Sequence, residues 1–292
     1  MSVYRSFNPS IVWGMLWCQP VKLIGLVLIS LRLALLVQRP MPRFFIVLKA
    51  MVLSVGLNIV LPLRLSEVIK PAYLWNHARI PLSVGTSAAF FERLTDLVIF
   101  CLFAIACLIL YLGGASILGL LVILSILCAV LFLFPYLEPL LRNLFSHVPS
   151  EKVRAFAANF LTHSVRHIST EIKYISLGLG AIIWMVSYLT VAIFLLASGY
   201  NSVGFEGAFL VFVATTVGLA IPLFPGGIGT YEAGAVVALK SLGFSLEEAV
   251  VVAVSMHVSQ FILFFTVAIA LLLKERIGLS GLVKKLIAGY GL

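Results

Sequence analysis

The sequence predicts an all-α, polytopic helical membrane protein, and its composition and hydropathy lead to this prediction. Hydrophobic residues make up 62% of the 292 residues, charged residues only 11%, and mean hydropathy is +1.16. Such a composition does not supply the polar surface of a water-soluble protein. A spanning helix needs about 20 apolar residues, so the chain has room for about six to eight membrane segments. We therefore expect a single integral membrane domain over residues 1–292.

Hydropathy divides the chain into successive apolar segments. They lie near residues 11–37, 44–62, 86–111, 115–136, 175–198, 206–224, 228–242 and 248–273. The segment 228–242 is short and glycine-rich for a spanning helix. We therefore expect 206–242 to form either two short spans or a re-entrant hairpin that turns at Pro225-Gly-Gly-Ile-Gly229.

The loops predict the orientation of the chain, because Lys and Arg are enriched on the cytoplasmic side of membrane proteins. The 137–174 connection carries five such residues, whereas 199–206 carries none. We therefore place 137–174 in the cytoplasm. Counting spans from there puts both termini in the cytoplasm. We expect the protein to lie in the cell inner membrane. The exceptions are Arg39 and Arg43, which fall outside on this count.

Within 137–174, the spacing predicts a basic amphipathic helix at the membrane interface. Its apolar face holds Val153, Phe156, Phe160, Leu161, Val165 and Ile168, and its polar face holds Lys152, Arg154, His163, Arg166 and His167. Two interpretations stay open: the cations bind anionic lipid headgroups, or they only fix the topology. We favour the topological role.

We predict no metal site and no cofactor. His163 and His167 are four residues apart, yet only Glu171 stands near them as a third ligand. The cysteines Cys18, Cys101, Cys107 and Cys128 lie in apolar runs without metal-ligand spacing, and we interpret them as free core thiols. The chain has no P-loop, dinucleotide or His-Glu-x-x-His motif, which disfavours ATPase and zinc-protease chemistry.

Charged residues inside apolar segments are the strongest functional signal, because each costs roughly 2.5–3.5 kcal/mol at a helix centre on insertion scales. One cluster is Arg64, Glu67 and Lys70, which share a face if the chain is helical after Pro62. A second is Glu92, Arg93 and Asp96, and Asp96 is the sole aspartate of the chain. These residues are expected to line a polar cavity, or else to lock helices together as buried ion pairs.

The third cluster is the glycine-rich break that contains Gly226, Gly227 and Gly229 and ends at Glu232. Irregular backbone persists at membrane depth only where protein or a polar cavity covers it. The glycines and the free N–H groups of the next helix suit a phosphate or carboxylate. The alternatives are that Glu232 only caps that helix and that the glycines only form the turn of a hairpin.

The three clusters together contain one more carboxylate than cation. The cations are Arg64, Lys70 and Arg93, and the carboxylates are Glu67, Glu92, Asp96 and Glu232. We therefore expect that some carboxylates are protonated, exchange protons, or bind a cationic group. This assigns Arg64, Lys70, Arg93 and the three glycines to substrate binding, and the four carboxylates to proton coupling or helix orientation.

These motifs together resemble the lysylphosphatidylglycerol synthase transmembrane-region family, also called the flippase-domain family. The residues that carry the resemblance are Pro62-x-Arg64-x-Ser66-Glu67, Glu92-Arg93-x-x-Asp96 and Pro225-Gly-Gly-Ile-Gly-x-x-Glu232. The resemblance covers about residues 20–275. It implies a helical membrane protein that moves lipids between leaflets, here without the soluble aminoacyl-transferase domain of the bifunctional relatives.

Three function hypotheses follow. The first is a lipid translocase for an anionic phospholipid or a polyprenyl-phosphate-linked lipid. The second is a membrane enzyme or enzyme subunit, such as a transferase acting on a polyprenyl-phosphate sugar, with one of the four carboxylates as general base. The third is a structural subunit in which the charges lock helices. Membrane lipids are the expected partners; a transferase partner and a homodimer stay open, and no nucleic-acid partner is expected.

Overall fold

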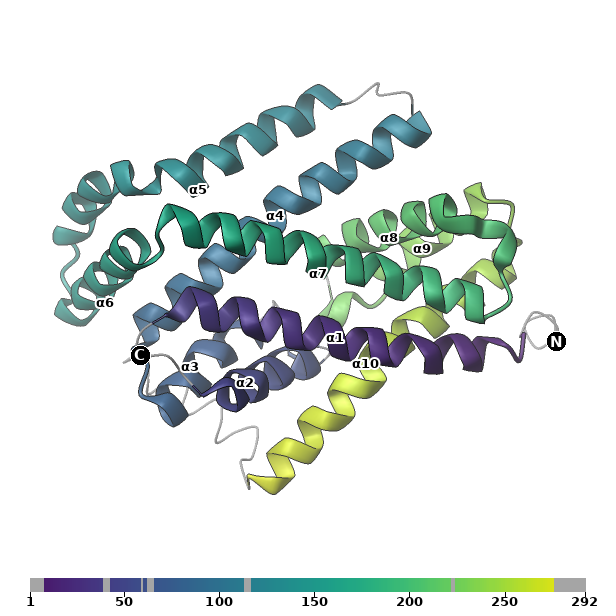
Figure 1. The fold of residues 1–292 in the computed structure, drawn as a ribbon, viewed down its shortest axis with the longest axis horizontal. Coiled ribbons are helices and arrows are strands. Elements are labelled where there is room, and N and C mark those ends of the chain that lie inside the picture. The colour runs from purple at the N-terminus through teal and green to yellow at the C-terminus, as the bar shows by residue number, and fades with distance from the viewer. Residues whose placement is uncertain are drawn as a thin grey trace. The chain divides into compact units, whose positions relative to one another are not determined.

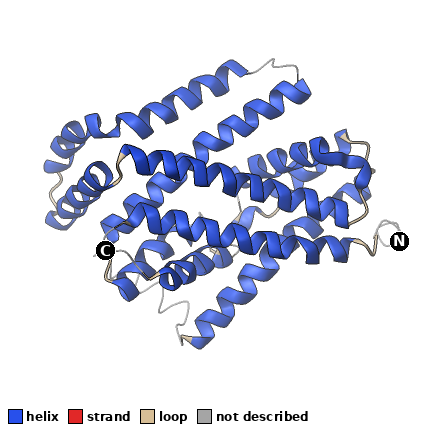
Figure 2. Ribbon diagram, viewed as in Figure 1, coloured by secondary structure: helices blue, strands red, loops and turns tan. Residues whose placement is uncertain are grey.

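The structure is a computed structural model that describes residues 8–38, 43–58, 60–61, 66–112, 117–221 and 224–275. In these ranges every regular element is a helix, and no strand is present (Figure 2). The predicted all-α fold is therefore confirmed. The α-helices are α1 Ile11–Val37, α2 Phe44–Leu57, α3 Ser66–Ala78, α4 Leu82–Leu112, α5 Ile117–Ser146, α6 Glu151–Thr162, α7 Thr170–Ala197, α8 Gly204–Ala220, α9 Thr230–Ser241 and α10 Leu246–Lys274 (Figure 1).

Six of the described helices are long and apolar enough to cross a membrane. They are Ile11–Val37, Leu82–Tyr111, Leu118–Ser146, Thr170–Ala197, Asn201–Ala220 and Leu246–Lys274. Each overlaps a segment predicted from hydropathy, so the multi-pass membrane architecture is confirmed. The apolar segment predicted at 44–62 contains the shorter helix α2, and the segment predicted at 228–242 contains the shorter helix α9.

The chain divides into two compact units. The first unit comprises 1–26, 55–66 and 183–269, and the second comprises 27–54, 67–182 and 270–292. Helices α1, α2, α7 and α10 contribute residues to both units. Each unit is described separately below.

In the first unit, α8 and α9 form a closely packed antiparallel hairpin (Figure 1). A Cβ atom built on Gly218 would lie 2.2 Å from the Thr230 carbonyl oxygen, and one on Gly234 would lie 2.3 Å from the Ala214 carbonyl oxygen. Gly218 of α8 thus faces Thr230 of α9, and Ala214 of α8 faces Gly234 of α9. The two helices therefore run in opposite directions. The glycines let the backbones approach directly, as small residues do between membrane helices.

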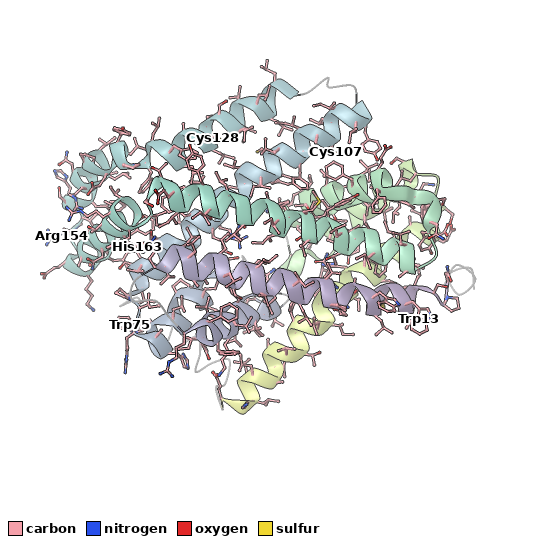
Figure 3. All side chains as sticks on the ribbon, viewed as in Figure 1. Trp13, Trp75, Cys107, Cys128, Arg154 and His163 are labelled. Atoms are coloured by element: carbon pink, nitrogen blue, oxygen red, sulfur yellow. The ribbon has the colours of Figure 1, made fainter. Side chains whose placement is uncertain are left out.

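In the second unit, α4, α5 and α6 pack around aromatic side chains. Phe91 on α4 and Phe134 on α5 make an edge-to-face contact with ring centroids 5.5 Å apart, and Phe90 reaches Phe160 on α6 at 5.9 Å. Edge-to-face pairs at this separation add to the stabilisation from buried apolar area. Figure 3 shows the labelled Cys107 on α4 and Cys128 on α5, which are free thiols like Cys18 and Cys101.

Two helices differ from the hydropathy prediction. Helix α5 continues to Ser146, ten residues beyond the expected end at 136, although Pro135 and Pro139 lie inside it. Its last turns are more polar, so a hydropathy window ends before the helix does. Helix α3 was not among the predicted apolar segments, because Lys70, Asn76 and His77 lower its hydropathy.

The predicted amphipathic helix exists as α6, but the prediction of its faces is partly wrong. Lys152, Arg154 and Arg166 are exposed as expected, but His163 is buried and Val153 is exposed. The chain from His163 to His167 forms a π-helical turn, which is wider than an α-turn and shifts the helical register. His163, which is labelled in Figure 3, begins this turn and is only 2% exposed. Burial lowers the pKa of His163, and its ring contacts Ser87 Oγ and the Val37 carbonyl oxygen.

Candidate functional site

Six charged side chains of the second unit form one connected network, which we call the acid–base cluster. Its members come from α1, α3 and α4: Arg32, Glu67, Lys70, Glu92, Arg93 and Asp96. The structure therefore brings together Glu67, Lys70, Glu92, Arg93 and Asp96 from the predicted site. Arg64 lies outside the described residues.

Arg32 is the cluster member that the sequence hypothesis did not include. It lies in α1 with 1% of its side chain exposed, and its Nη1 donates to Asp96 Oδ1 at 2.7 Å. Its Nη2 also lies 3.5 Å from Glu92 Oε1. The signal was present in the sequence, because an arginine inside the apolar run 11–37 requires a compensating partner. Spacing alone does not identify that partner 64 residues away.

Lys70 and Glu92 form the buried centre of the cluster. The side chains are 1% and 0% exposed, and Lys70 Nζ donates to Glu92 Oε2 at 3.1 Å. Lys70 also lies 2.6 Å from Glu67 Oε2, three residues earlier on α3. A buried ion pair needs further polar contacts to offset the loss of hydration. Arg32 on one side and Glu67 on the other provide them.

Arg93 occupies the accessible edge of the cluster. Its side chain is 43% exposed, and its guanidinium lies between three carboxylates: Glu67 at 3.5 Å, Glu92 at 3.3 Å and Asp96 at 3.3 Å. Arg93 Nε has no hydrogen-bond partner in the described part of the chain. Arg93 is therefore the cation of this cluster that is most open to a ligand, whereas Lys70 and Arg32 are enclosed.

The charges of the described cluster balance. Arg32, Lys70 and Arg93 oppose Glu67, Glu92 and Asp96. The sequence count differed in three residues: it omitted Arg32, it included Arg64, which lies outside the described residues, and it included Glu232, which belongs to the first unit and contacts a histidine. A balanced cluster is less costly to bury than one with a net charge.

The glycine turn, residues 224–229, connects α8 to α9 in the first unit. Gly227 and Gly229 have φ values of 75° and 85°, in the left-handed region that favours glycine. The Gly227 N–H donates to the Phe224 carbonyl at 3.1 Å, and the Gly229 N–H donates to Glu232 Oε2 at 2.7 Å. Glu232 therefore caps α9, which is one of the two roles that the sequence left open. Residues 222–223 lie outside the described ranges.

His257 on α10 is a second partner of Glu232, and the sequence hypothesis did not include it. Its Nδ1 lies 2.6 Å from Glu232 Oε1, and its Nε2 lies 3.1 Å from the Gly226 carbonyl oxygen. The ring is 3% exposed and stacks on Tyr231, with centroids 4.2 Å apart. A histidine in the apolar segment 248–273 was the available signal.

A small polar cavity lies beside this contact in the first unit. It is open on one side, and its lining comprises Cys18, Lys22, Thr190, Tyr231, Ser259 and Gln260 together with the apolar Val191, Phe194 and Met256. Lys22 on α1 is 8% exposed, and its Nζ donates to the carbonyl oxygen and Oγ of Ser259 at 2.5 and 2.9 Å. The Cys18 thiol is a further hydrogen-bond partner of this buried amine.

The ranges described above contain no group of three or more His, Cys, Asp or Glu side chains arranged to hold a metal ion. His163 uses both ring nitrogens in contacts with Ser87 and Val37. His167 lies beside it, with ring centroids 5.5 Å apart.

Comparison with known proteins identifies the family. Searches among curated proteins and among solved structures found no match. The family described as the lysylphosphatidylglycerol synthase TM region matches residues 1–268, and the match spans α1 to α9 and most of α10. Both the acid–base cluster and the glycine turn lie within it. The chain therefore belongs to the lysylphosphatidylglycerol synthase transmembrane-region family.

Proposed function

We propose that this protein is a lipid translocase that moves an anionic lipid between the leaflets of a membrane. The family links the chain to lipid metabolism or lipid flipping. The proposal of translocation rests on the exposure of Arg93. This partly exposed cation lies in the helix Leu82–Tyr111, at the edge of the charge-balanced acid–base cluster. Charged groups inside a spanning helix mark substrate pathways in transport proteins.

In this proposal Arg93 contacts the phosphate of the headgroup while the hydrocarbon tails stay in the bilayer. The Arg93 side chain is 43% exposed, and its contacts with Glu67 and Asp96, at 3.5 and 3.3 Å, are long enough to be exchanged for a phosphate. Arginine forms shorter, charge-assisted bonds to phosphate oxygens, often two at a time. Glu67 and Asp96 then retain Lys70 and Arg32 as partners.

Arg32, Lys70 and Glu92 have a positioning role in this proposal. All three are almost fully buried, so a lipid headgroup does not reach them while the cluster is closed. They hold α1, α3 and α4 together through ion pairs, which is the lock role that the sequence left open. The acid–base cluster therefore has two parts in this proposal. The buried ion pairs hold the helices together, and the exposed Arg93 binds the ligand.

We further propose that α8 and α9 form a re-entrant hairpin. Helix α9 has 12 residues, and at 1.5 Å per residue it spans about 18 Å of a hydrocarbon core about 30 Å thick. It packs antiparallel to α8 through Gly218 and Gly234. The turn at Gly226, Gly227 and Gly229 then lies at membrane depth, where its amides become a second headgroup contact if Glu232 releases the Gly229 N–H.

The substrate class is a lipid with a phosphate group, either an anionic phospholipid or a polyprenyl-phosphate-linked lipid. Arg93 and the glycine amides recognise phosphate oxygens, which both lipids share. We place the protein in the cell inner membrane with both termini in the cytoplasm, as the distribution of Lys and Arg indicates.

The alternative of a membrane transferase requires a carboxylate that accepts a proton from a substrate. Glu67, Glu92 and Asp96 are each paired with cations, and Glu232 is held by His257 and the Gly229 amide. The cation pairing disfavours Glu67, Glu92 and Asp96 as general bases. We therefore favour transport over catalysis.

Leaflet exchange in proteoliposomes tests the role of Arg93. We expect Arg93→Ala to lower the exchange rate of a fluorescent anionic phospholipid or a short-chain polyprenyl phosphate by at least about tenfold, the effect of losing one charged hydrogen bond. Arg142→Ala is the matched control, because Arg142 is 46% exposed and also pairs with a carboxylate on its own helix. Thermal unfolding in detergent establishes that both variants are folded. Equal exchange rates for folded Arg93→Ala and the control would contradict the proposal.

A further inference from the structure

Both ring nitrogens of His257 on α10 face acceptors, Glu232 Oε1 and the Gly226 carbonyl oxygen, and a neutral imidazole supplies a hydrogen to only one of them. His257 Nε2 lies 3.1 Å from the Gly226 carbonyl oxygen. A carbonyl oxygen only accepts hydrogen bonds, so Nε2 carries a hydrogen. In a neutral imidazole with hydrogen on Nε2, the other nitrogen, Nδ1, carries only a lone pair.

That lone pair would face an acceptor. His257 Nδ1 lies 2.6 Å from Glu232 Oε1, and an ionised carboxylate oxygen also only accepts. Two acceptors do not stay at hydrogen-bond distance without a proton between them. Either His257 is an imidazolium, or Glu232 is a carboxylic acid. In both cases the pair holds one proton more than a neutral imidazole and a carboxylate.

We propose that Glu232 and His257 form a proton-binding site, in which one proton bridges Glu232 Oε1 and His257 Nδ1 and fastens the glycine turn to α10. The bound proton does not require lipid translocation, but the glycine turn that it fastens is the one proposed above as a second headgroup contact. Histidine and glutamate are the side chains that proton relays in membranes use. The pair becomes neutral as a whole when the proton is bound, and it carries one negative charge when the proton leaves.

The surroundings favour retention of the proton and also allow its exchange. The His257 ring is enclosed between the rings of Tyr231 and Phe261, with centroid distances of 4.2 and 4.6 Å. The Glu232 side chain is 22% exposed, which gives the proton a route to exchange. The other titratable groups beside this contact are Tyr231 on α9 and, across the adjoining cavity, Cys18 and Lys22 on α1. Helix α7 contributes Thr190, Val191 and Phe194 to that cavity, and none of these side chains is titratable.

Proton occupancy is coupled to the glycine turn because the pair holds both of its ends. His257 Nε2–H donates to the Gly226 carbonyl, and Glu232 Oε2 accepts the Gly229 N–H at 2.7 Å. Loss of the proton leaves one ring hydrogen for two acceptors, Glu232 Oε1 and the Gly226 carbonyl oxygen, so that one of the two hydrogen bonds is lost. We therefore expect release of the proton to loosen the turn.

Nitrogen-15 NMR of histidine-labelled protein in detergent tests for the bound proton. Above neutral pH, where an exposed imidazole is neutral, wild type should show either a His257 ring with both nitrogens protonated or a protonated glutamate in the infrared spectrum. His257→Gln identifies the His257 signals by their loss. A neutral His257 ring together with an ionised Glu232 would overturn the proposal.

Glu232→Gln provides the matched variant, because its amide N–H donates to Nδ1 and its oxygen still accepts the Gly229 N–H. It thus supplies the bridging hydrogen without a titratable proton. We expect the variant to fold, to show a neutral His257 ring, and to lose the carboxylic-acid band if wild type has one. Glu247→Gln, an exposed change on α10, should alter neither signal. A doubly protonated His257 in Glu232→Gln would contradict a proton shared with Glu232.

Hydrogen exchange of the turn tests the coupling. At one fixed pH, amides 224–232 should exchange at similar rates in wild type and Glu232→Gln, and several-fold faster in His257→Ala, which has no ring to hold the turn. The α5 amides serve as an internal reference for global unfolding. Unchanged exchange of the turn in folded His257→Ala would overturn the coupling while leaving the bound proton to the NMR result.

Discussion

The buried charged side chains of the acid–base cluster are compensated by partners on other helices. Glu92 is fully buried, and it is tolerated because Lys70 and Arg32 approach it from two other helices. The sequence predicted that Glu92, Arg93 and Asp96 belong together, since they lie within one turn and a half of a helix. It did not predict Arg32 or His257, because their partners lie far away in the sequence and only the folded chain brings them close.

Removal of Arg32 should strongly destabilise the protein. Arg32→Ala removes the closest described cation of Asp96 and one of the cations beside the buried Glu92, and breaking a buried pair costs about 3–5 kcal/mol. Thermal or urea unfolding in detergent measures the change. Arg142→Ala, which breaks the exposed contact with Glu138 at 2.6 Å, should cost less than about 1 kcal/mol. Equal stability of Arg32→Ala and wild type would show that Arg32 does not hold the cluster together.

At the element scale, helix packing decides what hydropathy leaves undetermined. The long helices α1, α4, α7 and α10 were predicted within a few residues, because a run of about 20 apolar residues determines a spanning helix. The short helix α3 was not, since it has only 13 residues and Lys70, Asn76 and His77 lower its hydropathy. The π turn at His163 was also missed, because an inserted residue leaves no periodic signal in a single sequence.

The α8–α9 hairpin should be sensitive to a single methyl group. Gly218→Ala places a Cβ 2.2 Å from the Thr230 carbonyl oxygen, and Gly234→Ala places one 2.3 Å from the Ala214 carbonyl oxygen. Backbone must move in each case, and we expect a loss of about 1–3 kcal/mol, as for other overpacked sites.

Gly178→Ala is the control for both changes. Gly178 lies in α7 with open space around the new Cβ, so the change should be neutral or slightly stabilising. Thermal unfolding in detergent compares the three variants. If Gly218→Ala and Gly234→Ala were as stable as Gly178→Ala, the close antiparallel packing of α8 and α9 would be wrong.

At the scale of the whole molecule, composition and hydropathy established the class of protein, and the family match gave its relation to lipids. The candidate site was predicted in part. Its charged residues stood out in apolar sequence, whereas the division of the charges into a balanced cluster and a separate Glu232–His257 contact required the structure. The first arises from three helices and the second from α9 and α10, and neither arrangement follows from local spacing.

Lipid selectivity of the purified wild-type protein tests the central claim most directly. Leaflet exchange should be measured in proteoliposomes for a fluorescent anionic phospholipid, a short-chain polyprenyl phosphate and a neutral lipid without phosphate, with protein-free liposomes as reference. The account predicts that exchange of at least one phosphate-bearing lipid rises in proportion to the amount of protein, while exchange of the neutral lipid stays at the protein-free rate. Folded protein that accelerates none of these lipids, or all three equally, would contradict it.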